Sequence, residues 1–269
     1  MSFLEVHEVR KRFGGLHALD GASLAVREGS ITGLIGPNGS GKTTMLNVIT
    51  GYEKMDAGRL LFRDRHLDKP RPDRICMLGI GRTFQLTRIF GSLTVRQNLL
   101  VGSRAVPLGR RRELYSPERL DGLLDFIGLR RLQDERGASL SYGQRKLVEL
   151  AMILAQDPKL LLLDEPAGGI NPTLIGHLSE HIKELNRNGM TVLVVEHNME
   201  FVMDICDEII VMQQGRVILT GAPDVVRADS RVLDAYLGGA LDDDDEDDKV
   251  ITTTQPGPSV SAIDHGELR

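Results

Sequence analysis

The sequence predicts an α/β protein in which helices flank a mostly parallel β-sheet. From residue 141 onward, helix-like segments alternate with short apolar runs, which is the order of βαβ units. Before that, the glycine-rich segment GPNGSGKTT (36–44) lies between a strand-like run and a helix-like run. Hydrophobic residues make up 41% of the 269 residues, yet only 4% are aromatic and Trp is absent. Leu, Ile, Val, Ala and Met must therefore build the core, which suits a sheet covered by helices.

The first half of the chain begins with β-like runs and continues into a more polar middle. The expected strands are LEVHEV (4–9), SLAV (23–26), ITGLIG (31–36), RLLF (59–62) and GIGRTF (79–84). The expected helices are KTTMLNVIT (42–50), LTVRQNLLVG (93–102) and SPERLDGLLDFIGL (116–129).

The second half is more regular. After a helix that opens at Ser141, the expected strands are KLLLL (159–163), TVLVV (191–195), EIIVM (208–212) and, after a turn at QGR, VILT (217–220). Helices are expected at 173–189 and 199–206, and two short ones end near DAYLGG (234–239). This alternation predicts that neighbouring strands run parallel.

Negative charge is concentrated at the C-terminal end. Residues 241–269 carry nine Asp or Glu and two Lys or Arg, a net charge of −7 within the chain's −5, which leaves +2 for the rest. Residues 239–269 are therefore expected to be a disordered acidic tail. The nearly neutral body argues against nucleic acid as a partner. With no apolar run of membrane-spanning length and no signal-peptide pattern, the chain is expected to be cytosolic.

The glycine-rich segment fits the phosphate-loop pattern G-x-x-x-x-G-K-[ST]. Glycines allow successive backbone N–H groups to converge on an anion at the N-terminus of the following helix. Lys42 would reach the β and γ phosphates, Thr43 would place its hydroxyl on Mg²⁺, and Thr44 lies within reach of the α phosphate. The alternative is a glycine-rich turn that happens to precede Lys and Thr. The remaining residues expected to line the phosphate site are Gly36, Asn38, Gly39, Ser40 and Gly41.

The segment KLLLLDEP supplies the acidic partner of this loop. Its four leucines predict a strand buried on both faces, and Asp164 lies at the carboxyl end, where open α/β sheets bind ligands. Asp164 can hold Mg²⁺ together with Thr43. Glu165 is well placed to orient water against a γ phosphate and is the candidate general base. The alternative is two acids that cap a strand before Pro166.

The segment LSYGQ (140–144) predicts a helix start. Ser141 as N-cap and Gln144 three residues later form a capping box, and the apolar positions that follow keep a helical rhythm. That interpretation accounts for Ser141 and Gln144 but gives no role to Gly143.

Together, GPNGSGKTT, LSYGQ and LLLLDEP closely resemble the ATP-binding subunit of ABC transporters, in which LSYGQ is the signature motif. The resemblance covers about residues 4–238. Phe13 matches the aromatic residue on which adenine stacks, Gln85 matches the Q-loop, GGIN (168–171) matches the D-loop, and His197 matches the switch histidine. Each has a plainer interpretation: Phe13 as core, Gln85 as a loop amide, Asn171 as an N-cap, and His197 as a capped strand end.

The resemblance implies a phosphate-loop NTPase core with an N-terminal antiparallel β subdomain and an inserted helical subdomain. The ATP-binding domain would span residues 2–238, with the helical subdomain at about 88–155. ATP would bind between two such domains, so that Ser141, Gly143 and Gln144 of one face the phosphate loop of the other. Lys42 and His197 would stabilise charge on the γ phosphate and Glu165 would polarise the attacking water. Gln85 would sense the nucleotide and join Thr43 and Asp164 around Mg²⁺.

Longer phrases resemble the larger ATPase subunit of branched-chain amino acid importers. They include GIGRTFQLTRIFGSLTVRQNLLVG, DEPAGGINP and VVEHNMEFVM. The resemblance implies integral membrane permease partners, a second ATPase subunit, an external solute-binding protein and a place at the cytoplasmic face of the membrane. Two alternatives stay open: an importer ATPase for urea or short amides, and a soluble ABC-type assembly ATPase.

Overall fold

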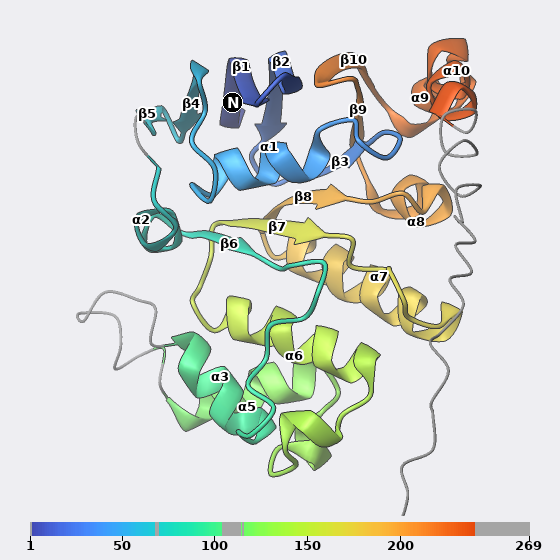
Figure 1. Cartoon of the computed structure of the whole chain (residues 1–269). Coiled ribbons are helices and arrows are strands. Elements are labelled where there is room, and N and C mark those ends of the chain that lie inside the picture. Colours follow the sequence, from blue (N-terminus) through green and yellow to red (C-terminus); the bar gives the residue numbers. More distant parts are fainter. Residues whose placement is uncertain (1, 68–69, 104–113, 115, 240–269) are drawn as a thin grey trace, which may run out of the picture.

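Two β-sheets with helices packed around them make up the fold (Figure 1). The structure is a computed structural model that describes residues 2–67, 70–103, 114 and 116–239. The segment expected to be a disordered acidic tail lies outside the described residues, except for Gly239, the last residue of α10. No helix in the described part of the chain is both long and apolar enough to cross a membrane.

The larger sheet has six strands in the order β10-β9-β3-β8-β7-β6. Every pair in it is parallel except β10 with β9, which confirms the expected mostly parallel sheet. Because parallel strands end at the same edge, the segments that follow β3, β7 and β8 meet there. The strands are β3 (Ile31–Ile35), β6 (Ile80–Arg82), β7 (Leu160–Asp164), β8 (Thr191–Val195), β9 (Glu208–Gln213) and β10 (Arg216–Gly221).

Strand β7 is buried on both faces, as its four leucines predict. Leu160 and Leu162 pack into the core beneath α1 (Lys42–Ile49) and the smaller sheet. Leu161 and Leu163 point to the opposite face and pack with the helices there. The two-residue period of the strand thus places the sheet between two apolar layers. Those helices include α7 (Pro172–Arg187), α8 (Met199–Ile205), α9 (Pro223–Ala228) and α10 (Ser230–Gly239).

The smaller sheet is antiparallel, in the order β2-β1-β4-β5. Its strands are β1 (Ser2–Phe13), β2 (Leu16–Arg27), β4 (Ala57–Phe62) and β5 (Arg65–His66). Strands β1 and β2 form a hairpin that extends well beyond the predicted LEVHEV and SLAV. Half of the added residues are charged or polar, and cross-strand pairing rather than an apolar pattern holds them in the sheet. Strand β5, with two residues, and α2 (Pro72–Met77), with six, are too short for a periodic pattern in the sequence to indicate them.

A third apolar cluster lies between α3 (Val95–Ser103), α5 (Pro117–Phe126) and α6 (Tyr142–Leu154). Helix α6 belongs to two clusters at once. Leu147 and Ala151 face the helical cluster, whereas Leu150 and Leu154 face the sheet. Helix α6 therefore connects the helical part of the molecule to the large sheet, as Figure 1 shows. The helices match the expected insertion, although its bounds of about 88–155 stay a prediction.

Candidate active site

The loop between β3 and α1 keeps its shape because three of its residues have no side chain. Gly36 lies so close to the Met212 carbonyl that a Cβ would collide with it. Gly41 is the N-cap of α1 with φ of 102°, and a Cβ there would lie 2.5 Å from the Ala18 carbonyl oxygen. Gly39 also has a positive φ, at 73°. These are backbone positions that only glycine occupies without strain.

Lys42 begins α1 and folds back over this loop. Its Nζ donates hydrogen bonds to the carbonyl oxygens of Gly36 and Pro37, both at 2.8 Å. Burial lowers the pKa of Lys42, while the carboxylates of Glu165 and Asp164 oppose that shift. Lys42 is thus a buried cation whose closest compensating charges are the two acids expected to act with it.

The remaining loop residues divide into an anchored and an exposed group. Ser40 is buried, and its carbonyl accepts a hydrogen bond from the Gly215 N–H at 3.0 Å. Asn38, Gly39 and Thr43 are exposed and Thr44 is half-buried. The loop therefore presents its tip and the first turn of α1 to an approaching anion, as the sequence predicts.

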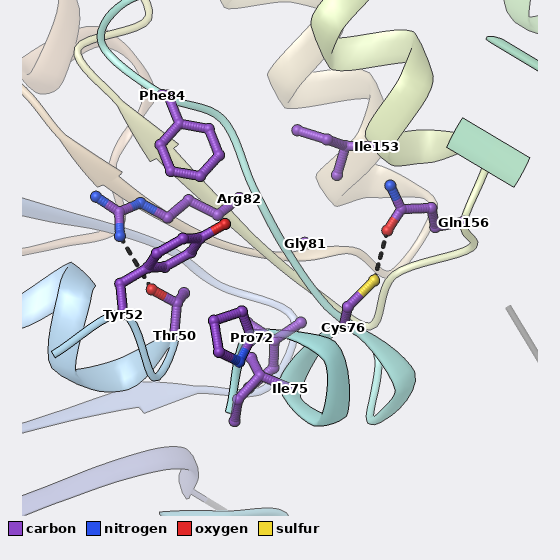
Figure 2. Close-up of a pocket in the computed structure, with 11 residues that line it drawn as sticks. Thr50, Tyr52, Pro72, Ile75, Cys76, Gly81, Arg82, Phe84, Ile153 and Gln156 are labelled. Atoms are coloured by element: carbon purple, nitrogen blue, oxygen red, sulfur yellow. Dashed lines mark hydrogen bonds between the residues drawn. The ribbon is translucent and has the colours of Figure 1, made fainter. Parts of the chain in front are cut away.

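Asp164 ends β7 and is held by an arginine from the neighbouring strand. Its carboxylate accepts a hydrogen bond from Arg82 Nη2 at 2.8 Å, and the two side chains are only 4% and 5% exposed. Nη1 of the same arginine donates to Asn47 of α1 at 2.8 Å and to Thr50, the C-cap of α1, at 2.9 Å; Figure 2 shows the Thr50 contact. Arg82 therefore connects the acidic end of β7 with the helix that follows the phosphate loop.

Glu165 follows in a left-handed backbone conformation, with φ of 48°. This conformation is unfavourable for a residue with a side chain, so its surroundings must hold it. Gln85 Nε2 donates to the Glu165 carboxylate at 2.9 Å, and Lys146 Nζ donates to the Glu165 carbonyl oxygen at 2.6 Å. The structure thus brings together Gln85 and Glu165, two residues that the sequence predicts to be catalytic.

The predicted switch histidine follows a buried carboxylate at the end of β8. Glu196 is fully buried and accepts hydrogen bonds from the N–H groups of Ala167 at 2.7 Å and His197 at 3.1 Å. The His197 side chain is 61% exposed, and its Nδ1 lies 3.9 Å from Glu196. Glu196 therefore fixes the backbone of the loop after Glu165 and that of His197, while the imidazole faces outward.

The capping box at the start of α6 is confirmed. The Gln144 N–H donates to Ser141 Oγ at 3.3 Å, and the Ser141 N–H donates to Gln144 Oε1 at 2.9 Å. Gly143 lies so close to the Leu174 side chain that a Cβ there would collide with it. Among the described residues, no hydrogen bond or ion pair joins Ser141, Gly143 or Gln144 to the loop at 36–44.

Two of the plainer interpretations can be tested directly. Phe13 is 45% exposed, with the Lys11 ammonium 4.8 Å above its ring, so its interpretation as a core residue is wrong. Asn171 does cap α7, since its side chain accepts a hydrogen bond from the Leu174 N–H at 2.9 Å. An exposed aromatic face suits stacking on a flat base, which keeps the adenine prediction for Phe13 open.

Comparison with known proteins identifies the family. The family model described as ABC transporter matches residues 19–168, which is more than half of the chain. The chain belongs to the ABC transporter family. A second model, described as Branched-chain amino acid ATP-binding cassette transporter, matches residues 216–242. These matches confirm two predictions, the ABC ATPase fold and the assignment of the chain as an ATPase.

Individual relatives agree with the family model. The high-affinity branched-chain amino acid transport ATP-binding protein LivG of Salmonella typhimurium is 39% identical over 250 residues, covering 88% of this chain and 98% of that protein. A solved structure of the ADP conformation of MJ1267, an ATP-binding cassette of an ABC transporter, matches with a TM-score of 0.77 at 36% identity, covering 88% and 99% of the two chains. The dimeric post-hydrolysis state of the cassette MJ0796, bound to ADP and Pi, matches at 0.70 and 26%, covering 82% and 98%.

The sequence did not indicate four charged residues that shape the acidic side of this ABC ATPase. We call Arg82, Lys146, Glu149 and Glu196 the charged framework, because each holds the end of β7, the segment after it, or the Q-loop at residues 84–88. Arg82, Glu149 and Glu196 are single charges in or beside apolar runs, as in LVELAMIL around Glu149, whereas Lys146 follows Arg145. A charge in such a run must be paired or hydrogen-bonded when it is buried, and this is the signal that could have revealed them.

Proposed function

We propose that this ABC ATPase is the ATP-hydrolysing subunit of an importer for branched-chain amino acids. It acts at the cytoplasmic face of the membrane on permease subunits that form the passage. The observation that carries the proposal is the meeting of the phosphate loop, Asp164 and a Glu165–Gln85 pair at one edge of the sheet. The match of residues 216–242 to the branched-chain model and the LivG relative support the solute class.

ATP binds with its phosphates against the loop at 36–44. Lys42 leaves its loop carbonyls to meet the β and γ oxygens, and the N-terminus of α1 adds positive potential. Phe13 offers its exposed ring face to adenine. The Thr43 hydroxyl, the Asp164 carboxylate and the Gln85 amide are hard oxygen donors, which Mg²⁺ prefers in combination with substrate phosphates. The bound ion supplies charge neutralisation on the phosphates.

Glu165 orients and polarises the water that attacks the γ phosphate. Gln85 holds that carboxylate through the 2.9 Å hydrogen bond, so the Q-loop sets the direction of the general base. Lys42 and His197 stabilise the charge that develops on the transferred group. Most of the catalysis is thus positioning and electrostatics, as phosphoryl transfer requires.

The site is completed by a second ABC subunit. Ser141 is exposed at the N-terminus of α6, where backbone N–H groups and the helix dipole favour an anion. It makes no hydrogen bond to the loop of its own chain among the described residues, so its partner phosphate belongs to another molecule. The similarity to the dimeric MJ0796 cassette supports a dimer.

The permease contact lies along the Q-loop. A cavity of about 180 Å³ opens beside it, where the rings of Tyr52 and Phe84 meet edge to face at 5.5 Å (Figure 2). Leu86, next to Gln85, and Phe90 are 78% and 49% exposed. Exposed apolar side chains next to a cavity suit a protein partner, and the Q-loop can carry the nucleotide state to it.

The test of the ATPase assignment is Glu165→Gln in the full chain. We expect ATP to be bound in a long-lived dimer while turnover is nearly abolished, measured by gel filtration with ATP and by phosphate release. Hydrolysis at the wild-type rate by Glu165→Gln would show that Glu165 is not the general base and would overturn the mechanism. A bulky substitution at Gly143 supplies a second check, since unchanged hydrolysis by a strict monomer contradicts a site shared between subunits.

The solute is tested separately. Cells that lack this chain should lose uptake of leucine, isoleucine and valine and keep that of urea and short amides. Loss of urea or amide uptake alone would instead support the alternative importer. Co-purification with soluble assembly proteins, in place of integral membrane proteins, would support the assembly ATPase.

A further inference from the structure

Three polar residues occupy one face of α6, at a spacing that places them in line. Tyr142, Lys146 and Glu149 follow one another at positions i, i+4 and i+7, which lie on the same side of a helix. The apolar residues between them face the two hydrophobic clusters that α6 joins. The three polar side chains are therefore not needed to pack α6 against the apolar clusters.

Two members of this face hold the backbone on either side of Gln85. Tyr142 Oη donates to the Gln85 carbonyl oxygen at 3.2 Å. The Glu149 carboxylate accepts from the Arg88 N–H at 3.1 Å and from the Phe84 N–H at 3.4 Å. The Q-loop is thus tied to α6 at three backbone points, none of which involves its own side chains.

The third member holds the other half of the catalytic pair. Lys146 Nζ donates to the carbonyl oxygens of Glu165 at 2.6 Å and Pro166 at 3.3 Å. Because Gln85 and Glu165 are themselves hydrogen-bonded, the contacts close into a ring that runs from α6 through the Q-loop to the general base and back. A movement of α6 would therefore displace both ends of the Gln85–Glu165 bond.

We propose that Tyr142, Lys146 and Glu149 are positioning residues that register Gln85 against Glu165 and make the hydrolysis rate follow the position of α6. The inference rests on the proposed function, because it assumes that Glu165 is the general base. It predicts a loss of turnover with little change in ATP binding, since none of the three contacts the phosphate loop.

The cost of burying Glu149 supports a role beyond stability. The side chain is 4% exposed, and burial raises its pKa to about 7 against the hydrogen bonds from Arg88 and Phe84 and the charges of Lys146 and Arg88. Asp164 lines the same small cavity, with its carboxylate paired to Arg82. Between about pH 4.5 and 7 the folded chain holds a proton that the unfolded chain lacks, so stability falls as this carboxylate ionises. Ionisation of Glu149 thus lowers the stability of the fold while it strengthens the hydrogen bonds that the carboxylate accepts from the Q-loop.

The experiment compares Glu149→Gln with the wild-type full chain over pH 6 to 8. In the wild type we expect kcat to rise through an apparent pKa near 7, because the ionised carboxylate is the stronger acceptor. In Glu149→Gln that rise should disappear, with kcat about fivefold lower at pH 8 and KM for ATP within about twofold. Chemical denaturation at pH 8 should show no loss of stability. The matched control is Glu118→Gln, an exposed carboxylate on α5 of the same helical region, which should keep the wild-type profile.

Two further variants make the inference independent of any folding defect. Tyr142→Phe removes one hydroxyl from an exposed side chain and should lower kcat about twofold to fivefold at unchanged KM. Lys146→Met should lower kcat about tenfold, and its effect should be non-additive with Glu149→Gln. A wild-type pH profile in Glu149→Gln, or a parallel loss of stability and ATP affinity, overturns the inference. A different result, hydrolysis at the wild-type rate by Glu165→Gln, would show that the proposed function is wrong.

Discussion

The phosphate loop and the acidic end of β7 face the same nucleotide site but hold their shape by different means. The loop at 36–44 is contiguous in sequence and depends on glycine backbone and on Lys42, which bonds carbonyls only five and six residues away. The end of β7 is held by Arg82 from β6, Lys146 from α6 and Glu196 from the end of β8. One half is local backbone geometry, and the other is a set of buried charges from three elements.

This difference separates function from stability within a single site. A buried group that loses its partner is left in a medium that solvates it poorly, so loss of Arg82 beside Asp164, or of the Glu196 carboxylate beside its N–H donors, should destabilise the whole fold. The loop exposes Asn38, Gly39 and Thr43 and holds Lys42 through its own carbonyl groups, so changes there should affect the ligand more than the fold. The predictions below test this contrast, beginning with the largest expected effect.

Arg82→Ala should produce the largest change. It leaves the Asp164 carboxylate buried and unpaired, and it also removes the two hydrogen bonds from Nη1 to Asn47 and Thr50. We expect the free energy of unfolding to fall by about 3–5 kcal/mol, measured by urea denaturation at pH 7.5. The matched control is Arg216→Ala, which breaks an ion pair with Asp20 at the surface and should change stability far less. Similar results for the two variants would mean that the Arg82 pair is no different from a surface pair.

Lys42→Ala should have the opposite effect, with a large loss of ATP affinity and little change in stability. Loss of a charge-assisted contact to phosphate should weaken ATP binding about tenfold to a hundredfold, measured by calorimetry. The unfolding free energy should change by no more than about 1 kcal/mol, because burial already disfavours the Lys42 charge in the folded chain. If affinity is retained, the phosphate-loop assignment is wrong. If the fold is lost, the contrast between the two halves is wrong.

The same contrast separates what the sequence could predict from what it could not. The loop, the buried strand with Asp164 at its end and the capping box at Ser141 each follow from residues close together in the chain. Arg82 and Asp164 are 82 positions apart, and Glu149 meets a backbone 61 positions away, so no local pattern connects them. Only the fold brings these partners together.

The misjudged elements have the same cause. The outer parts of β1 and β2 mix charged and apolar residues without a regular alternation, and they become strands because they pair with each other. Phe13 belongs to that outer part, which explains why an apolar residue is exposed rather than in the core. Long-range pairing therefore overrides the local pattern here, as it does in the charged framework.

Glu196→Gln tests a second member of the charged framework, with a smaller expected loss of stability than Arg82→Ala. A glutamine has one acceptor oxygen for the N–H groups of Ala167, His197 and Asn198, which now share two carboxylate oxygens. We expect a loss of about 1–3 kcal/mol in unfolding free energy, measured by urea denaturation. Glu28→Gln, at an exposed turn position, is the control and should leave stability unchanged. An equally small effect of both changes would show that the Glu196 contacts do not support the loop.

Tyr236→Phe has the smallest expected effect and tests whether the loop is really self-contained. The Gly36 N–H donates a hydrogen bond to Tyr236 Oη of α10 at 3.0 Å, a contact 200 positions apart. Burial raises the pKa of this hydroxyl, so it is protonated and neutral throughout the working range. Its removal leaves the first amide of the loop without this partner, and we expect ATP to bind about twofold to tenfold more weakly.

The control for that change is Tyr52→Phe, at a half-exposed tyrosine beside the Q-loop, which should bind ATP as the wild type does. Calorimetry on both variants decides the question. If only Tyr236→Phe loses affinity, helix α10 supports the phosphate loop. The loop would then depend on local backbone geometry and one long-range contact, whereas the end of β7 depends on long-range contacts alone. If affinity is unchanged in both, the glycine backbone and Lys42 are sufficient to shape the loop, because the amide of Gly36 can then exchange its protein partner for water without cost to the ligand.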